Sequence, residues 1–215
     1  MVVQWLGRVD YQEALVTQET YLEKRLKGEI TDTLLLLEHD PVYTIGRSSD
    51  RTSLETGHAL PHPVVEISRG GKATYHGPGQ LVGYAILDLQ DYGKDLHAYL
   101  RALEDSLISL CSDLGLNATR RDGLTGVWVE DRKLASIGVG VRRWISMHGF
   151  ALNVCGKLDG FDAIIPCGIA NVTMTSLQRE VPRSDWSVEA VAKDYPPFLE
   201  SALSKLRRRT KDLKE

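Results

Sequence analysis

The chain contains few cysteines, and their spacing excludes two kinds of cysteine-based structure. Its 215 residues include three cysteines, Cys111, Cys155 and Cys167, and no Cys-x-x-Cys pair. An odd number of cysteines argues against a disulfide framework, and the missing pair argues against a zinc site. Each cysteine is therefore expected either to fill the core or to take part in chemistry, and no metal site is expected.

Long apolar segments and a strong net charge are also absent. The longest apolar run, residues 34–37, is far too short to span a bilayer, and residues 1–5 lack the basic region and apolar segment of a signal peptide. The net charge of −3 creates no overall field for nucleic acid or for a membrane surface. We therefore expect a cytoplasmic protein without nucleic-acid or membrane partners.

Two common nucleotide-binding motifs are missing. A P-loop requires Gly-x-x-x-x-Gly-Lys-Ser/Thr, but Glu66 stands five residues before Gly71, and Ala73 follows Lys72. The dinucleotide fingerprint requires glycines that open a helix, whereas the glycines here lead into a strand-like segment. A Rossmann domain is therefore not expected.

Hydrophobic residues make up 42% of the chain and follow both helical and strand-like patterns. Spacings of three and four residues predict helices over residues 11–26, 96–114, 187–193 and 197–209. Runs of β-branched and apolar residues predict strands over residues 33–38, 64–67 and 81–87, and three antiparallel strands within residues 126–154. No linker divides the chain, so we expect one domain, residues 1–215. Its expected class is α/β (α+β), with a mixed β-sheet core and flanking helices.

The most informative segment, residues 69–80, concentrates glycine between two of the expected strands. It reads Arg-Gly-Gly-Lys-Ala-Thr-Tyr-His-Gly-Pro-Gly-Gln. Glycines gather this densely where the backbone must approach another group closely or adopt positive φ. Because the segment also carries a cation and an imidazole, we expect it to form the wall of a small-molecule site. A flexible surface hairpin is the alternative.

Cys167 is the best candidate for a nucleophile. It lies between Pro166, which has a fixed φ, and Gly168, which has no side chain, so we expect a tight turn at the end of an apolar strand. Such a turn presents the thiol instead of packing it. Cys111 lies on the apolar stripe of an expected helix and Cys155 at a strand end, and burial explains both.

A cysteine nucleophile reacts as the thiolate. A free thiol has a pKa of about 8.5, so a neighbouring cation or base is needed. The candidates are Lys72, Lys133, His76 and His148. Lys133 begins a strand rich in small residues, where partial burial would make it able to exchange a proton near neutrality. The alternatives are a solvated lysine after a charged turn and, for His148, a satisfied core histidine.

Several blocks in a fixed order carry a resemblance to a known family. They are residues 34–39, 41–47, 69–80, 126–129, 133–138, 142–144, 148–154 and 165–169. Together they resemble the lipoyl(octanoyl) transferase family over residues 33–177. Two positions depart from the family pattern, namely Ala85, where Gly-Tyr-Pro is usual, and Asp40, which replaces a first proline. Both put only local loop shape in doubt.

The resemblance implies an enzyme that holds an octanoyl group as a thioester. Cys167 matches the family's acyl-accepting cysteine, and Lys133 matches the lysine that activates that thiol and works as acid and base. The implied fold is the catalytic core shared with lipoate and biotin protein ligases, and no cofactor is implied. The segments that match the acyl-substrate lining comprise Arg69, Gly70, Gly71, Lys72, Ala73, Thr74, Tyr75, His76, Ser136, Ile137, Gly138, Gly149, Phe150 and Ala151.

The resemblance also implies protein partners. The donor would be octanoyl-acyl carrier protein, and the acceptors would be lipoyl domains of 2-oxoacid dehydrogenase complexes and the glycine cleavage H protein. Arg69, Lys72, Arg142 and Arg143 are candidates to meet acidic carrier proteins, although a solvated charged rim is the default interpretation of each.

Two other functions remain open at this point. An ATP-dependent lipoate or biotin ligase would use the same fold, but the chain lacks the biotin-ligase Gly-Arg-Gly-Arg run and the lipoate-ligase Gly-Gly-Gly loop. Adenylation would also not require Cys167. A non-catalytic module that binds acyl carrier protein would leave Cys167 unmodified.

Overall fold

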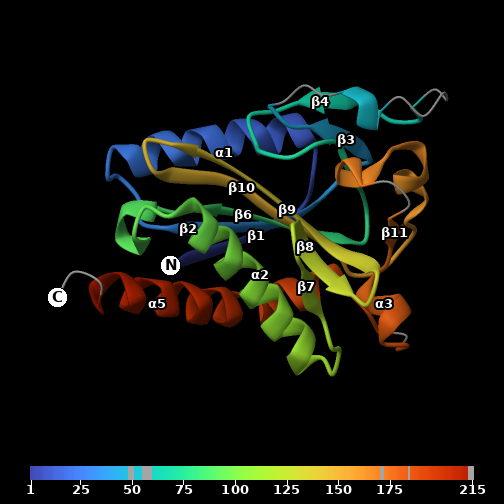
Figure 1. The fold of residues 1–215 in the computed structure, drawn as a ribbon. Coiled ribbons are helices and arrows are strands. Elements are labelled where there is room, and N and C mark those ends of the chain that lie inside the picture. The colour runs from blue at the N-terminus through green and yellow to red at the C-terminus, as the bar shows by residue number, and fades with distance from the viewer. Residues whose placement is uncertain (48–50, 55–59, 170–171, 184, 213–215) are drawn as a thin grey trace.

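A large mixed sheet forms the centre of the fold in the computed structural model, which describes residues 1–47, 51–54, 60–169, 172–183 and 185–212 (Figure 1). Its strands are β1 (Val2–Val9), β2 (Thr33–His39), β6 (Gln80–Ile86), β7 (Thr119–Arg121), β8 (Leu124–Val129), β9 (Arg132–Arg142), β10 (Ile145–Asn153) and β11 (Thr173–Met174). Within the described residues, these eight strands follow the order β1-β2-β6-β10-β9-β8-β7, and β11 pairs with β9. The pairs β1–β2 and β9–β11 are parallel, and the other pairs are antiparallel.

A second, smaller sheet lies beside the large one. It contains β3 (Val42–Ile45), β4 (Val64–Glu66) and β5 (Thr74–His76) in the order β4-β3-β5. Strand β5 falls inside the glycine-rich segment, which therefore is not a loop throughout. The segment joins β4 of the small sheet to β6 of the large one, so the alternative of a surface hairpin is wrong.

Helices cover both faces of the large sheet (Figure 1). On one face α1 (Tyr11–Leu26) packs against β6 and β10, and on the other lie α2 (Leu96–Asp113) and α5 (Pro196–Asp212). The short helices α3 (Leu177–Glu180) and α4 (Val188–Asp194) precede α5. Asp10 caps α1 by accepting the N–H groups of Gln12 and Glu13. The expected class, a mixed sheet with flanking helices, is confirmed.

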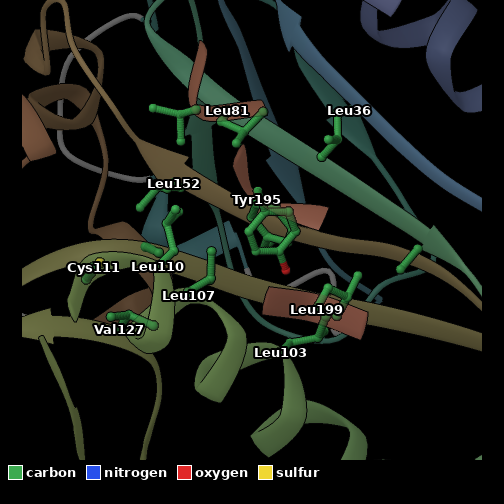
Figure 2. Packing of buried hydrophobic residues seen from close by; sticks show 14 of the residues in the cluster. Leu36, Leu81, Leu103, Leu107, Leu110, Cys111, Val127, Leu152, Tyr195 and Leu199 are labelled. Carbon is green, nitrogen blue, oxygen red and sulfur yellow. The ribbon is translucent and has the colours of Figure 1, made fainter. Parts of the chain in front are cut away.

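The main core lies between the large sheet and the α2–α5 pair (Figure 2). Leu36, Leu81 and Leu152 point from the sheet towards Leu103 of α2 and Leu199 of α5. All are almost fully buried, and burial of each leucine contributes about 2 kcal/mol. Cys111 belongs to this cluster, as its place on the apolar stripe of α2 predicts. The four helices and the three antiparallel strands predicted from apolar spacing are confirmed, with bounds shifted by a few residues.

In the described part of the chain, four short 3-10 helices connect the larger elements. They are η1 (Arg51–Ser53), η2 (Leu89–Tyr92), η3 (Asp159–Ala163) and η4 (Pro166–Gly168). The expectation that Cys167 ends an apolar strand is therefore wrong. Ile164 and Ile165 connect η3 to η4, because the aspartates of η3 and the proline that opens η4 interrupt any β ladder.

The two departures from the family pattern lie in different settings. Ala85 is inside β6, paired with Leu34, so it leaves no loop shape in doubt. Asp40 lies between β2 and β3 and forms an exposed ion pair with Arg8. Among the described residues, no helix combines the length and the apolar character that crossing a membrane requires.

Candidate active site

A cavity of about 360 Å³ lies where the large sheet meets the glycine-rich segment. Its walls come from β9, β10, β5, the starts of α1 and α2, and the turn that carries Cys167. The lining residues are Tyr11, Arg69, Gly70, Gly71, Lys72, Thr74, His76, Tyr84, Leu96, Leu100, Gly123, Leu124, Thr125, Lys133, Ser136, Ile137, Gly138, Val139, His148, Gly149, Phe150, Ala151, Cys167 and Ile169.

All the expected substrate-lining residues reach this cavity except Ala73 and Tyr75. Side chains alternate along a strand, so Thr74 and His76 face the cavity while Tyr75 faces the other way. Tyr75 packs against Tyr43 and Phe161, with ring centroids 5.6 and 5.4 Å apart, and Ala73 belongs to the same cluster. The two residues form a small core beneath the cavity wall, and their placement in the lining was wrong.

Lys133 is buried at the side of the cavity, with 1% of its surface exposed. Its Nζ donates to the Cys167 sulfur at 3.2 Å and to the Thr125 carbonyl at 3.2 Å. The same amine lies 5.2 Å from the centre of the Trp128 ring. The alternative of a solvated lysine is therefore wrong, and burial is more complete than the partial burial expected from the sequence.

Gly126 makes room for the Lys133 side chain. A Cβ at position 126 would lie 2.9 Å from the Lys133 Cε and 2.5 Å from the Ala135 carbonyl oxygen. Its φ of +129° is also one that side chains rarely adopt. A glycine at this position of β8 thus lets the buried amine reach Cys167.

The Cys167 turn has an unusual backbone. Cys167 adopts φ 56° and ψ 16°, in the left-handed region that few residues other than glycine occupy. Its N–H donates to the Ala73 carbonyl at 2.8 Å, which ties the turn to the glycine-rich segment. The Ser136 hydroxyl lies 3.7 Å from the sulfur. The turn therefore holds the thiol between a hydroxyl and an amine, both from β9.

The other two thiols lie in settings that disfavour the thiolate. Burial raises the pKa of Cys111 to about 12. Burial, and to a smaller extent the Glu38 carboxylate, raises the pKa of Cys155. Neither thiol lines the cavity. Cys167 is thus the cysteine that the structure brings to an amine and a hydroxyl.

Two of the four cations expected to meet carrier proteins, Arg69 and Arg142, have partners within the chain. Arg69 is buried, and its guanidinium donates to the Gly70, Lys72 and Thr44 carbonyls at 2.9 Å each. It fixes the glycine-rich segment from within and is not available at a surface. Arg142 forms an exposed ion pair with Glu23, so it stays at the surface.

Three histidines lie near the inner part of the cavity. Burial lowers the pKa of His39 to about 4, of His76 to about 3 and of His148 to about 4. All three are therefore neutral at pH 7, and none is a cation that could hold the Cys167 thiolate. Among the described residues, no three His, Cys, Asp or Glu side chains are grouped as metal ligands would be.

Several lining residues do not follow from the sequence. Tyr11 and Leu100 lie at helical spacing with core residues, so their pattern predicts burial and not contact with a ligand. Tyr84 lies within an apolar strand, and its hydroxyl contacts the His39 ring at 2.6 Å. The sequence offers one indication of such lining residues, which is a tyrosine or histidine inside a buried strand. A buried polar group needs a hydrogen-bond partner, and a ligand can supply it.

The sequence is similar to the sequences of one group of enzymes. Residues 10–195 match the family described as the lipoyl protein ligase A/B catalytic domain. The octanoyltransferase of Geobacter sulfurreducens is 52% identical over 193 residues, which cover 90% of this chain and 81% of that protein. The octanoyltransferase of Geobacter metallireducens is 48% identical over 214 residues, covering 94% and 98% of the two chains.

Solved structures share the fold at much lower identity. Lipoate-protein ligase A bound with ATP has a TM-score of 0.68 and 16% identity, over 99% of this chain and 95% of that chain. The biotin protein ligase of Aquifex aeolicus with biotin and ATP has a TM-score of 0.62 and 15% identity, over 97% and 73%. These likenesses show the fold alone, and they confirm the expected catalytic-core architecture.

Proposed function

The chain belongs to the octanoyltransferases of the lipoyl protein ligase A/B catalytic-domain family, and on that premise we propose that Cys167 carries the octanoyl group as a thioester. Residues 1–215 would form a single catalytic domain. The observation that carries the proposal is the 3.2 Å contact between the Lys133 amine and the Cys167 sulfur at the edge of the cavity.

The first half-reaction loads the enzyme. The Lys133 amine takes the proton of the Cys167 thiol, and the thiolate attacks the carbonyl carbon of the octanoyl thioester on acyl carrier protein. The new carbon–sulfur bond forms as the bond to the carrier's sulfur breaks, and Lys133 returns the proton to the leaving thiolate. The Ser136 hydroxyl, next to the Cys167 sulfur, is placed to donate to negative charge that develops there.

The second half-reaction transfers the acyl group. The amine of an acceptor lysine attacks the Cys167 thioester, a carbon–nitrogen bond forms, and the carbon–sulfur bond breaks. The proton lost by the attacking amine passes to Lys133 and then to the Cys167 sulfur, which restores the thiol. Because one thioester is exchanged for another and then for an amide, no ATP is required.

The cavity suits an unbranched acyl chain. Leu100, Ile137 and Phe150 supply apolar contacts, and the small residues Gly138 and Ala151 let the chain lie close to the sheet. Each buried methylene of such a chain contributes about 0.8 kcal/mol. Octanoyl burial would thus provide several kcal/mol of binding without any charged contact to the chain.

The partners proposed for this chain are two kinds of protein. Octanoyl-acyl carrier protein is the donor. The acceptors are lipoyl domains, those of 2-oxoacid dehydrogenase complexes and of the glycine cleavage H protein. Both must reach the same sulfur, so the carrier leaves before the acceptor lysine arrives, and the kinetics are ping-pong.

Intact-mass spectrometry after incubation with octanoyl-acyl carrier protein tests the proposal. The native protein should gain the mass of one octanoyl group, and Cys111→Ala and Cys155→Ala should gain it too. Cys167→Ala should gain nothing. An octanoyl adduct on Cys167→Ala would overturn the proposal.

A ligase reaction is tested in parallel. The protein is incubated with octanoate, ATP and a lipoyl domain, without carrier protein. We expect no octanoyl-adenylate and no modified lipoyl domain. Modification that depends on ATP and persists in Cys167→Ala would favour a ligase instead.

A further inference from the structure

One imidazole in the cavity lining has no hydrogen-bond partner among the described residues. His148 lines the cavity and is 2% exposed, and neither Nδ1 nor Nε2 has a partner. The expectation of a satisfied core histidine is therefore wrong. A buried polar group of this kind normally binds water or a polar group of a ligand.

The neighbouring histidines are satisfied, which sets His148 apart. The ring nitrogens of His39 contact the Val9 carbonyl at 2.8 Å and the Tyr84 hydroxyl at 2.6 Å. His76 contacts the Gln80 amide oxygen at 2.8 Å. Tyr84 approaches His148 only through its ring, edge to face at 6.2 Å.

The backbone turns His148 towards this part of the cavity. Its φ is 58°, unusual inside a strand, and its N–H donates to the Gln18 side chain at 2.9 Å. Burial, together with the charge of Arg69, lowers the pKa of the imidazole to about 4. The ring is therefore neutral at pH 7 and offers one donor and one acceptor. A hydroxyl group, which can both donate and accept, complements it.

The distance from Cys167 matches the length of the acyl chain. On β9, Ser136 lies beside the Cys167 sulfur and pairs with Ala151, while Val139, three residues further, pairs with His148. Three residues of a strand span about 10 Å. An extended octanoyl chain, with carbon–carbon bonds of about 1.5 Å, spans roughly the same length. The ω end of a chain held on Cys167 therefore reaches the His148 region.

We propose that the end of the cavity around His148 is a polar subsite that binds a hydroxyl group at the ω end of an acyl chain of octanoyl length. With an unsubstituted octanoyl chain, a water molecule takes the place of that hydroxyl. A longer apolar chain would displace the water and leave the imidazole unsatisfied, which disfavours it. The subsite therefore limits chain length and admits ω-hydroxyacyl groups.

The inference rests on the proposed thioester on Cys167, and two matched donors test it. The donors are 8-hydroxyoctanoyl- and nonanoyl-acyl carrier protein, whose acyl groups have the same number of non-hydrogen atoms and differ in a terminal hydroxyl or methyl. We measure the rate of adduct formation on Cys167 by mass spectrometry at donor concentrations below saturation. The native enzyme should prefer the hydroxylated donor about tenfold, the value of one hydrogen bond.

Variants locate the preference at His148. His148→Leu should abolish the preference, whereas His148→Gln, which keeps a donor and an acceptor, should retain part of it. Tyr99→Phe removes a hydroxyl from the core outside the cavity and should leave the preference unchanged. Thermal unfolding of each variant identifies any that fails to fold.

The outcomes separate the two proposals. If octanoyl donor forms no adduct on Cys167, the proposed function fails. If octanoyl adduct forms but the native enzyme treats the matched donors equally, the subsite holds water only and the inference is overturned. The inference also fails if His148→Leu folds and keeps the full preference.

Discussion

The Glu104 carboxylate accepts the backbone N–H of Gly126 at 3.0 Å, which joins helix α2 to the strand residue that packs against Lys133. Glu104 is fully buried and also forms ion pairs with Arg101 and Arg120. A buried carboxylate with three partners holds its neighbours more rigidly than an exposed one. The position of the Lys133 amine thus depends on a residue of α2 that does not line the cavity.

Glu104→Ala should lower both stability and acyl transfer. Loss of the hydrogen bonds to a charged group costs about 1 to 3 kcal/mol of unfolding free energy, and freeing Gly126 lets Lys133 move from Cys167. Glu104→Gln keeps an acceptor for Gly126 and should retain more activity. The control is Arg120→Ala, which leaves the Gly126 contact intact. Denaturant unfolding and single-turnover transfer measure the two effects, and equal activity in the Ala and Gln variants would contradict the positioning role.

Lys133→Arg should separate charge from proton transfer. The guanidinium stays protonated at any ordinary pH, so it can support the Cys167 thiolate but cannot accept a proton. We expect acylation of Cys167 to survive in part and transfer to the lipoyl domain to fail. Mass spectrometry measures the octanoyl adduct on Cys167, and the mass increase of the lipoyl domain measures transfer. Turnover equal to that of the native enzyme would show that only the charge matters.

Gly168→Ala should reduce acylation far more than stability. Its φ is +67°, and a Cβ there would lie 2.2 Å from the Lys72 Cδ, so either the Lys72 side chain, which lines the cavity, or the Cys167 turn would have to move. A displacement of about 1 Å in a catalytic group costs about a hundredfold in rate. Gly115→Ala is the matched control, because its φ is +78° and nothing lies within 4 Å of the added Cβ. Both variants should lose about 1 kcal/mol of stability. Similar acylation by the two would dismiss the steric argument.

The buried histidines should make the fold sensitive to mild acid. The pKa values of His39 and His76 fall to about 4 and about 3 in the folded protein, against 6.5 when unfolded. The unfolded chain therefore takes up protons first, and stability decreases as pH falls below 6.5. Each histidine contributes up to about 1.4 kcal/mol per pH unit.

Urea unfolding between pH 6.5 and 5.5 measures this slope, in a range where carboxylates titrate little. His39→Gln should reduce the dependence of the unfolding free energy on pH by the contribution of one histidine. An unchanged slope in that variant would show that His39 is not responsible.

Much of the fold follows from local patterns in the chain. The stripe of Leu103, Leu107 and Leu110 predicts α2, and the Asp10 cap predicts the start of α1, because both depend only on spacing and on a nearby side chain. Strand β1 is not predicted. Only the pairing with β2 makes it a strand, and its side chains are exposed or half buried, which leaves no clear alternation.

The site shows the same division. The Pro166-Cys167-Gly168 sequence predicts a presented thiol, since proline and glycine restrict the local backbone. The contact between Lys133 and Cys167 joins residues 34 positions apart and depends on the packing of the two sheets. Residue types alone therefore left the role of Lys133 open. The unsatisfied state of His148 also could not be predicted, because it depends on where every neighbouring hydrogen bond is used.

Cys167 and Lys133 are anchored in different parts of the fold. Lys133 belongs to β9 of the large sheet, whereas the Cys167 turn is hydrogen-bonded to Ala73 and packs with the small sheet and its minor cluster. The three short strands and their small cluster bury fewer apolar residues than the main core, and we expect such a unit to open separately under native conditions. Amide hydrogen exchange should therefore be faster in β3 and β5 than in β6 and β10. Opening of the small sheet would then separate Cys167 from Lys133. The enzyme would lose acyl-transfer activity at denaturant concentrations where its helices are still intact.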